Sequence, residues 1–392
     1  MSTPSYLTGP CLLRRGGVSI FFESGLKVAT KSKSAEVKSD LHGGKIDEYL
    51  VSRMITLSGK PVDAIANLSA FFGLTNANVG ESIFKGTART ITSISLANPG
   101  VATFAAPHNL GAVGTTITGA AAGVAGGILP TTVNGTLTLT VLTSTTASIG
   151  VNVTAAGTGG TFTPEAEPLQ IVSKNDAAIY TYSRGGILKC PNVHLGAGKG
   201  FFSGDLQLAC LGSLTKTQVS PTYWKSAVST AFADTTFDET KIRRYRYTAA
   251  YGAAPYDAMT AQGGFDVMID NTTVEIPDDN FGVGDIILSG VTAGCKFTPS
   301  NLTEAQVDTL LNLQDTTAIL PGDSFAKLGT TNLVISGTDA VGSFTATLLG
   351  AGFKDSQLEY AVGKLRTGEI MAMTRRTWTA GAANALFTFV AT

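Results

Sequence analysis

Histidine and cysteine are both scarce in this chain. Its 392 residues include three histidines and four cysteines, and no two cysteines stand at the spacing of metal ligands. A zinc motif needs four such side chains at short, regular spacings, so the composition argues against one. We expect the cysteines to be reduced and buried as small apolar side chains, as is usual for a protein assembled in a cytoplasm. They are Cys11, Cys190, Cys210 and Cys295.

Charged residues are also few. They make up 15% of the chain, against about 25% in an average soluble domain, and the net charge is −1. Such a composition suits a protein whose surface is largely covered by copies of itself, and it does not suit one that must neutralise nucleic-acid phosphates. No run approaches the roughly 18 apolar residues of a membrane helix, and Met1–Tyr6 lacks the pattern of a signal peptide. We therefore expect a soluble, unsecreted protein with no membrane partner.

Motifs of catalysis are missing as well. The glycine-rich runs 196–200 and 282–284 have neither the spacing of a phosphate-binding loop nor that of a dinucleotide fingerprint. Ser, His and Asp do not stand in the context of a nucleophile elbow. We therefore expect no enzyme activity, no cofactor and no metal site.

The segment Thr90–Pro164 contains no Asp, Glu, Lys or Arg in 75 residues. Two of its runs, Thr136–Val141 and Ser148–Val153, alternate between apolar and hydroxyl or small side chains as strands do. The pattern predicts a small antiparallel module with a hydroxyl-coated outer face, which we call the insert. A disordered Thr/Ala/Gly linker is the alternative, although linkers seldom contain this much Ile, Val and Leu.

With the insert removed, the remainder shows one pattern twice. The pattern includes the tripeptides Leu57-Ser58-Gly59 and Leu288-Ser289-Gly290, which are 231 positions apart. It also includes a predicted strand that begins at Leu169 and a similar one that begins at Leu333, 164 positions later. The difference, 67 positions, is close to the length of the insert. The sequence therefore predicts two homologous β-rich domains, the first of which is interrupted.

Three segments have the periodicity of short helices. They are Pro61–Leu68, Pro221–Phe232 and Leu302–Leu313, the last with Ser300 or Asn301 as the expected N-cap.

Two segments concentrate basic residues. Thr30–Gly44 is lysine-rich with interspersed acids and precedes Lys45–Leu57, a predicted strand on which both faces mix polar and apolar groups. It is either a solvated hairpin loop or a loop that reaches a neighbouring subunit. Lys241–Tyr247 interleaves basic and aromatic residues, which favours a domain-interface strand over a nucleic-acid site because acidic residues lie close by.

The order of these pieces resembles the tail tube, or major tail, proteins of bacteriophages with long non-contractile tails. An N-terminal arm, a strand, a long charged loop, a long two-faced strand and a short helix are followed by closing strands with Gly-Lys and Gly-Asp or Gly-Glu turns. The insert is similar to the small FCCH-like β modules found in phage structural proteins, on the residues Ile91–Thr103 and His108–Leu110.

The resemblance implies a mainly β fold with short helices, in which two tube-type, sandwich- or barrel-forming domains accompany a small inserted all-β module. The implied divisions are an N-terminal arm (1–16), a first tube-like domain (17–89 and 165–214), the inserted module (90–164), a linker (215–264) and a second tube-like domain (265–392).

The resemblance also implies a function. Rings of the protein stack into a hollow tail tube of the virion, through which DNA passes without sequence-specific binding. The protein is assembled in the host cytoplasm and meets other tail proteins at the tube ends. Two domains in one chain predict rings of three chains, and rings of six are the alternative. Thr30–Gly44 is expected to contact the next ring through Lys31, Lys33, Lys38 and Asp40. A surface adhesin, and a capsid or tail-sheath component, are the alternative functions.

Overall fold

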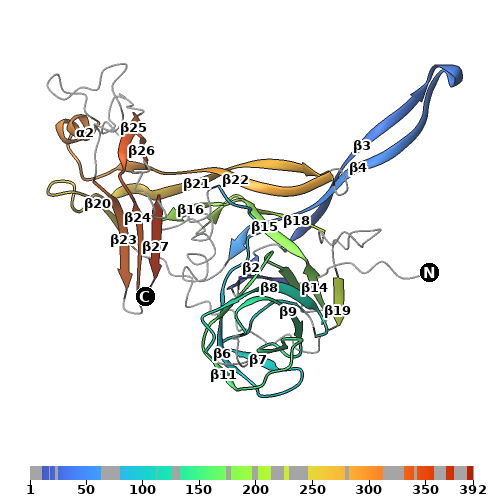
Figure 1. Ribbon diagram of the computed structural model, residues 1–392. Helices are drawn as coiled ribbons and strands as arrows, with labels where there is room; N and C mark the ends of the chain where they lie inside the picture. Colours follow the sequence, from blue (N-terminus) through green and yellow to red (C-terminus); the bar gives the residue numbers. More distant parts are fainter. Residues whose placement is uncertain are drawn as a thin grey trace.

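The chain is mainly β, as the sequence predicts (Figure 1). The computed structural model describes residues 11–16, 18–22, 25–62, 80–111, 113–125, 133–173, 178–196, 202–212, 225–228, 246–278, 282–311, 331–339, 342–356, 368–374 and 386–391. In this part of the chain the strands form five sheets. One of them is the insert. The other four form two pairs, which we call the first half and the second half of the molecule.

The insert is a closed barrel. Its strands are β6 (Arg89–Ile94), β7 (Val101–Phe104), β8 (Thr116–Ala122), β9 (Gly135–Val141), β10 (Thr146–Ser148), β11 (Gly157–Thr158) and β12 (Thr161–Pro164). The order β6-β12-β8-β9-β10-β7 returns to β6 through the β6–β7 ladder, so these six strands leave no free edge. Leu139 and Val141 point inward while Thr136 and Thr138 are exposed, which confirms the predicted alternation. The second predicted run is only partly a strand, because β10 ends at Ser148.

One sheet of the first half contains a strand from the predicted N-terminal arm. Its strands, in sheet order, are β19 (Lys225–Val228), β14 (Ala178–Tyr182), β13 (Leu169–Ser173), β1 (Cys11–Arg15), β2 (Val18–Phe22) and β5 (Pro61–Val62). Leu12 and Leu13 are fully buried between β13 and β2. The prediction of an extended arm is therefore wrong for residues 11–15, because their apolar side chains enter the core; residues 1–10 lie outside the described part.

The other sheet of the first half carries a long hairpin. Its order is β15 (Arg184–Lys189), β18 (Leu206–Leu211), β4 (Gly44–Gly59) and β3 (Lys27–Ser39), and the 3-10 helix η1 (Asp40–His42) joins β3 to β4. Lys45–Leu57 is a strand, as predicted. Most of the charged segment Thr30–Gly44, however, is the paired shaft of this hairpin, with η1 at its tip.

The second half is built in the same way. One sheet has the order β17 (Phe202–Ser203), β16 (Asn192–Leu195), β21 (Ala261–Asp278), β22 (Gly282–Pro299), β26 (Ile370–Met373) and β25 (Gly352–Ser356). The other has the order β20 (Tyr247–Tyr251), β23 (Leu333–Asp339), β24 (Gly342–Leu348) and β27 (Phe387–Ala391). The predicted linker 215–264 therefore contains a strand of each half, β19 and β20, and the second half begins earlier than residue 265.

The two halves share one order of strand pairing. The order β3-β4-β18-β15 corresponds to β21-β22-β26-β25, and the order β1-β13-β14-β19 corresponds to β20-β23-β24-β27. Each half thus has a hairpin-bearing sheet and a second sheet, and side chains from the four sheets meet in one hydrophobic core. The barrel has a separate core of its own.

The ladders also correct the spacing of the repeat. Leu206 pairs with Gly59, and Ile370, 164 positions later, pairs with Phe297. Gly59 and Phe297 are therefore equivalent, 238 positions apart, and the same spacing relates the first residues of β4 and β22, Gly44 and Gly282. The match between the two Leu-Ser-Gly tripeptides is accidental, since Leu288 lies seven positions before the equivalent of Leu57. The corrected spacing leaves 74 positions for the inserted segment, closer still to its 75 residues.

The predicted helices have different outcomes. Helix α2 (Glu304–Leu310) lies within the predicted 302–313, and its N-cap is Thr303, which forms a capping box with Gln306, rather than Ser300 or Asn301. The helix predicted over 221–232 is wrong at Lys225–Val228, which pairs with β14 as a strand. Of the helix predicted over 61–68, Pro61–Val62 is a strand and the remainder lies outside the described residues.

Candidate assembly interface

Two of the five sheets, the hairpin-bearing ones, follow one another from the first half into the second. Strands β15 and β16 follow one another with only Cys190 and Pro191 between them, and they pair on one side with β18 and β17. On its other side β16 pairs with β21, with Val193 opposite Val267. The hairpin-bearing sheets of both halves thus form one continuous surface, which we call the long sheet. Its two outer strands are β3 and β25.

The β21–β22 hairpin of the second half is docked on the first half. Backbone hydrogen bonds join a short segment of the first half to the edge of β22: Gly80 N donates to Leu288 O at 2.7 Å, Leu288 N to Glu81 O at 2.9 Å and Ile83 N to Ile286 O at 2.9 Å. Ile286 and Leu288 are 1% and 2% exposed. The edge of the hairpin is therefore satisfied by strand addition from the other half.

Polar side chains hold the same hairpin near its tip. Arg184 donates to Gly284 O at 2.7 Å and pairs with Asp285 at 3.3 Å. Its guanidinium lies over the ring of Phe84, 4.9 Å from the centroid. Ser82 Oγ donates to Asp285 Oδ1 at 2.6 Å.

Gly282, the first residue of β22, lies against β4. A Cβ at this position would lie 2.3 Å from Ser52 Cβ and 2.4 Å from Val51 O, and φ is +76°. Only glycine fits both the conformation and the close approach.

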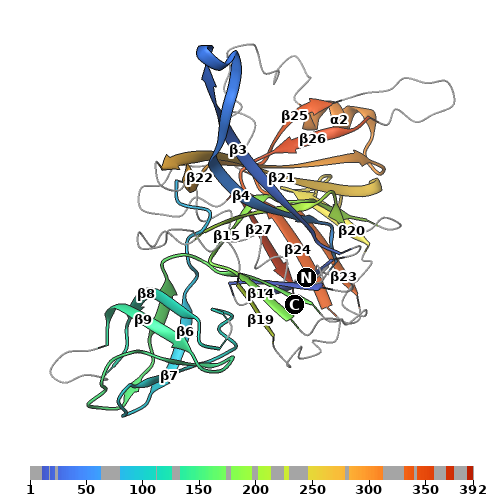
Figure 2. The ribbon, with the colours of Figure 1, turned by 90° about the vertical axis from the view of Figure 1, so that its right-hand side faces the viewer.

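The β3–β4 hairpin of the first half projects away from the body of the molecule (Figures 1 and 2). Residues 44–51 of β4 are all exposed. The exposed large apolar side chains of this hairpin are Val28, Val37, Leu41, Ile46, Tyr49, Leu50 and Val51, with Leu41 at the tip 92% exposed. A two-stranded ribbon with both faces in water is marginally stable, and a set of exposed apolar side chains marks an interaction surface.

The four residues predicted to contact the next ring all lie on this hairpin, but they do not form one cluster. Lys33 pairs with Glu275 of β21 at 3.1 Å, so it contacts the second half of its own chain. Lys38 pairs with Glu36 at 3.4 Å near the tip, and Asp40 lies in η1. Lys31 is exposed on the shaft opposite Met54.

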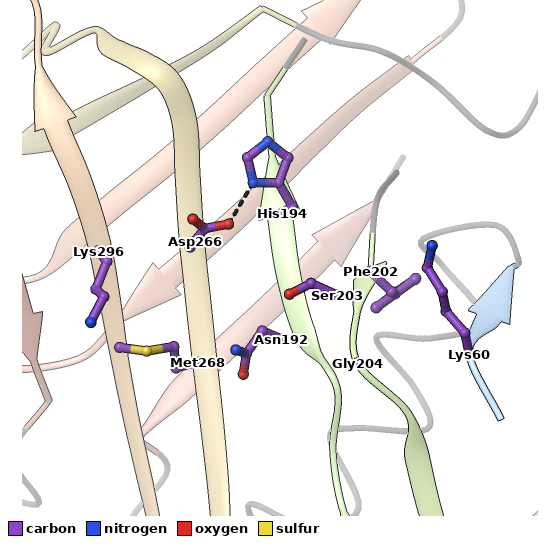
Figure 3. A pocket seen from close by; sticks show the side chains of 9 residues that line it. All are labelled: Lys60, Asn192, His194, Phe202, Ser203, Gly204, Asp266, Met268 and Lys296. Carbon is purple, nitrogen blue, oxygen red and sulfur yellow. Dashed lines mark hydrogen bonds and ion pairs between the residues drawn. The ribbon is translucent and has the colours of Figure 1, made fainter. Parts of the chain in front are cut away.

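A polar pocket of about 480 Å³ lies where the two halves join on the long sheet (Figure 3). His194 of β16 and Asp266 of β21 face each other across the seam, with Nδ1 and Oδ1 2.5 Å apart. Within the described residues His194 Nε2 has no hydrogen-bond partner, and it lies against Gly196. Ser203 also lines the pocket, and no hydrogen bond joins it to this ring among the described residues. Val193 and Val267 point into the core, so the pocket is on the opposite face of the sheet.

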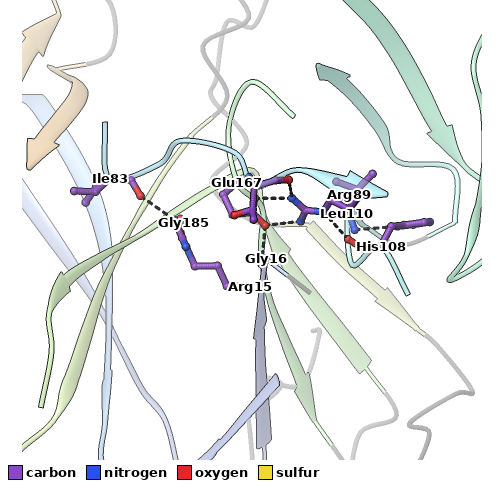
Figure 4. Close-up of polar contacts among 9 residues, drawn as sticks. Arg15, Gly16, Ile83, Arg89, His108, Leu110, Glu167 and Gly185 are labelled. Atoms are coloured by element: carbon purple, nitrogen blue, oxygen red, sulfur yellow. Dashed lines mark hydrogen bonds and ion pairs between the residues drawn. The ribbon is translucent and has the colours of Figure 1, made fainter. Parts of the chain in front are cut away.

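A buried ion pair joins the start and the end of the insert (Figure 4). Arg89 and Glu167 are 7% and 0% exposed, and both guanidinium NH2 groups donate to the carboxylate. The same carboxylate accepts from the backbone N–H groups of Gly16 and Thr87, at 2.7 and 2.8 Å. Arg15 lies beside this network and donates to Gly185 O and Ile83 O.

No protein-family model and no curated protein matches the chain. Over the described residues, no helix is long and apolar enough to cross a membrane, and no three His, Cys, Asp or Glu side chains gather as metal ligands. The four cysteines are buried thiols, as the sequence predicts. Burial raises the pKa of the Cys11, Cys210 and Cys295 thiols, which makes these groups poor nucleophiles.

Sequence reasoning did not find the residues of the docked hairpin. Arg184 and Asp285 are 101 positions apart, and neither belongs to a local motif. The one signal available was the recurrence of glycine at positions 44 and 282, which becomes visible only at the spacing of 238.

Proposed function

We propose that this protein is the tail tube protein of a long-tailed bacteriophage, a virion component that assembles in the host cytoplasm into stacked rings around a hollow lumen. The observation that carries the proposal is the long sheet: two copies of one strand arrangement, joined edge to edge by the β16–β21 ladder. Since the outer strands of this sheet are β3 and β25, the same edge-to-edge joining can continue from chain to chain. A ring closes when the outer strands of every long sheet are paired with those of the neighbouring chains.

The face of the long sheet opposite the core becomes the lumen wall in such a ring. His194 and Asp266 lie on this face, as does Lys296, which pairs with Glu369 at 3.2 Å. The polar side chains on this face are already paired with one another, so they give DNA phosphates little to hold. DNA therefore passes through the lumen without specific binding.

The two halves are the product of a duplication, and each ring contains three chains. The shared strand order and the constant spacing of 238 positions between β4 and β22 support a common origin. The insert, which has its own core and is tied to the first half at both ends, lies on the outside of the ring. The tip of the β3–β4 hairpin, with Lys38 and Asp40, extends toward the next ring.

Negative-stain electron microscopy of the purified full-length protein tests the proposal. Hollow tubes of uniform diameter are expected. Closed shells would indicate a capsid protein instead. Monomers that stay dispersed at high protein concentration would favour an adhesin whose barrel binds a receptor, because the barrel has a separate core and a hydroxyl-rich surface.

A further inference from the structure

We infer that the β3–β4 hairpin docks on the second half of another copy of this chain within the same ring, in the way that the β21–β22 hairpin docks on the first half of its own chain. The inference rests on the proposed ring and names its contact surface. It follows from the internal repeat, because each half carries one hairpin and, among the described residues, only the β21–β22 hairpin is covered within the chain.

Strands β4 and β22 of the two hairpins can be aligned residue by residue. The spacing of 238 positions aligns Gly44 with Gly282 at the start of the strands and Gly59 with Phe297 where they pair with β18 and β26. Positions 286, 287 and 288 of β22 therefore correspond to Glu48, Tyr49 and Leu50 of β4.

Equivalent positions differ sharply in burial. Ile286 and Leu288 are buried under the segment 80–83, to which their backbone is hydrogen-bonded. Their equivalents Glu48 and Leu50, by contrast, are both exposed, Leu50 to 50%. A strand edge that is covered in one half and open in the other predicts the same cover from a second chain.

Glycine at position 44 has no explanation within one chain. Its backbone is not in the left-handed region, and a Cβ there would meet no atom within 4 Å. At the equivalent Gly282 a Cβ would collide with Ser52, whose own equivalent is Gly290. Docking on a neighbouring copy would place Gly44 against Ser289 and Gly290 of that copy's β22, where glycine is again required by close approach.

The first test is Gly44→Val in the full-length protein. Because the chain leaves open space at this position, the variant is expected to keep the wild-type circular dichroism spectrum and urea midpoint. Its tube yield, counted by negative-stain microscopy at matched concentration, is expected to fall about tenfold or more, because the added side chain overpacks the contact. Thr136→Val, which places a valine on the exposed outer face of the barrel, is the control and should assemble normally.

The second test looks for a new product and does not depend on a loss of tube assembly. Gly44→Cys combined with Ser289→Cys, treated with a short bis-maleimide after assembly, is expected to give crosslinked chains in a ladder that stops at the number of chains in one ring. The native cysteines are buried and should not react. Each single-cysteine variant is expected to stay uncrosslinked.

Normal tube yield from Gly44→Val would overturn the inference, as would the absence of crosslinks in the double variant. A ladder that continues past one ring would also overturn it, because the contact would then join different rings. If Gly44→Val fails to fold, the crosslinking result decides. Wild-type protein that forms no tubes would overturn the proposed function itself, so the two failures are distinguishable.

Discussion

Arg89 and Glu167 form a buried ion pair through both carboxylate oxygens, at the two points where the chain enters and leaves the barrel. Two backbone N–H groups complete the coordination of the carboxylate. A charge this deep is tolerated only when it is paired and hydrogen-bonded, so removing one partner leaves the other uncompensated.

Glu167→Gln is therefore expected to destabilise the chain by roughly 3–5 kcal/mol, as broken buried ion pairs do. The measurement is urea unfolding followed by circular dichroism. Glu165→Gln is the matched control: its side chain is exposed two positions away, and its effect should stay within about 0.5 kcal/mol. Equal midpoints for the two variants would contradict the assigned role of the ion pair.

The same carboxylate predicts a pH dependence of stability. Burial alone would raise the pKa of Glu167, but the hydrogen bond and charge of Arg89, together with the charge of Arg15, outweigh it and hold the pKa below its ordinary value of 4.5. A depressed pKa in the folded state means that the stabilisation is complete above about pH 4.5 and is lost as the pH falls through the folded value. The urea midpoint of the wild type should fall over this acid range, and that of Glu167→Gln should fall less. Parallel curves would contradict the prediction.

The sequence was sufficient for features that repeat or that cover many residues. The insert could be predicted because absence of charge over 75 residues is a property of composition, and α2 because its apolar stripe has helical spacing. The repeat itself was visible, but its register was not, since a tripeptide such as Leu57–Gly59 recurs by chance. Hydrogen-bonded ladders between distant strands were needed to fix it.

Short strands and long-range contacts were beyond the sequence. Strand β1 has five residues, too few for a period, so its burial depends on β13 and β2, which a local pattern does not contain. The strand Lys225–Val228 was predicted as helix because pairing with β14 overrides local propensity. The contact of Arg184 with Asp285 likewise exists only once the halves are joined.

Deletion of Thr90–Pro164 with a short glycine linker is expected to leave tube assembly intact. The barrel has its own closed sheet and core, and both of its ends return to the same place in the first half, where Arg89 and Glu167 remain. Microscopy should show tubes of smaller outer diameter with an unchanged lumen. A deletion protein that is folded by circular dichroism but unassembled would show that the insert has a part in assembly.

Neutralising Lys31, Lys33 and Lys38 together, each to Gln, is expected to weaken stacking of the rings and to make it more sensitive to salt. The stability of the single chain should change little: the pair Lys33–Glu275 is largely exposed, with side chains 61% and 36% accessible, and exposed pairs contribute about 0–1 kcal/mol. Tube length at increasing salt is the measurement. Lys85→Gln is the control, because it removes an exposed ion pair with Glu81 that lies outside the β3–β4 hairpin. Unchanged length and yield in the triple variant would remove the hairpin from the stacking contact.

A ring of three chains is the last expectation. Heterologous contacts generate a closed ring only when the rotation at each contact divides the circle. In the proposed ring, the contact between the two halves of one chain is one such rotation, or step. If the contact between chains repeats that step, as the shared strand order suggests, each chain accounts for two steps of the ring. A ring of six tube units, the number that the resemblance implies, then needs three chains and displays three barrels. A cross-section by electron cryo-microscopy should therefore show three outer densities around a lumen with pseudo-sixfold symmetry. Six outer densities would mean that each chain supplies one step, and the equivalence of the two halves in the ring would be wrong.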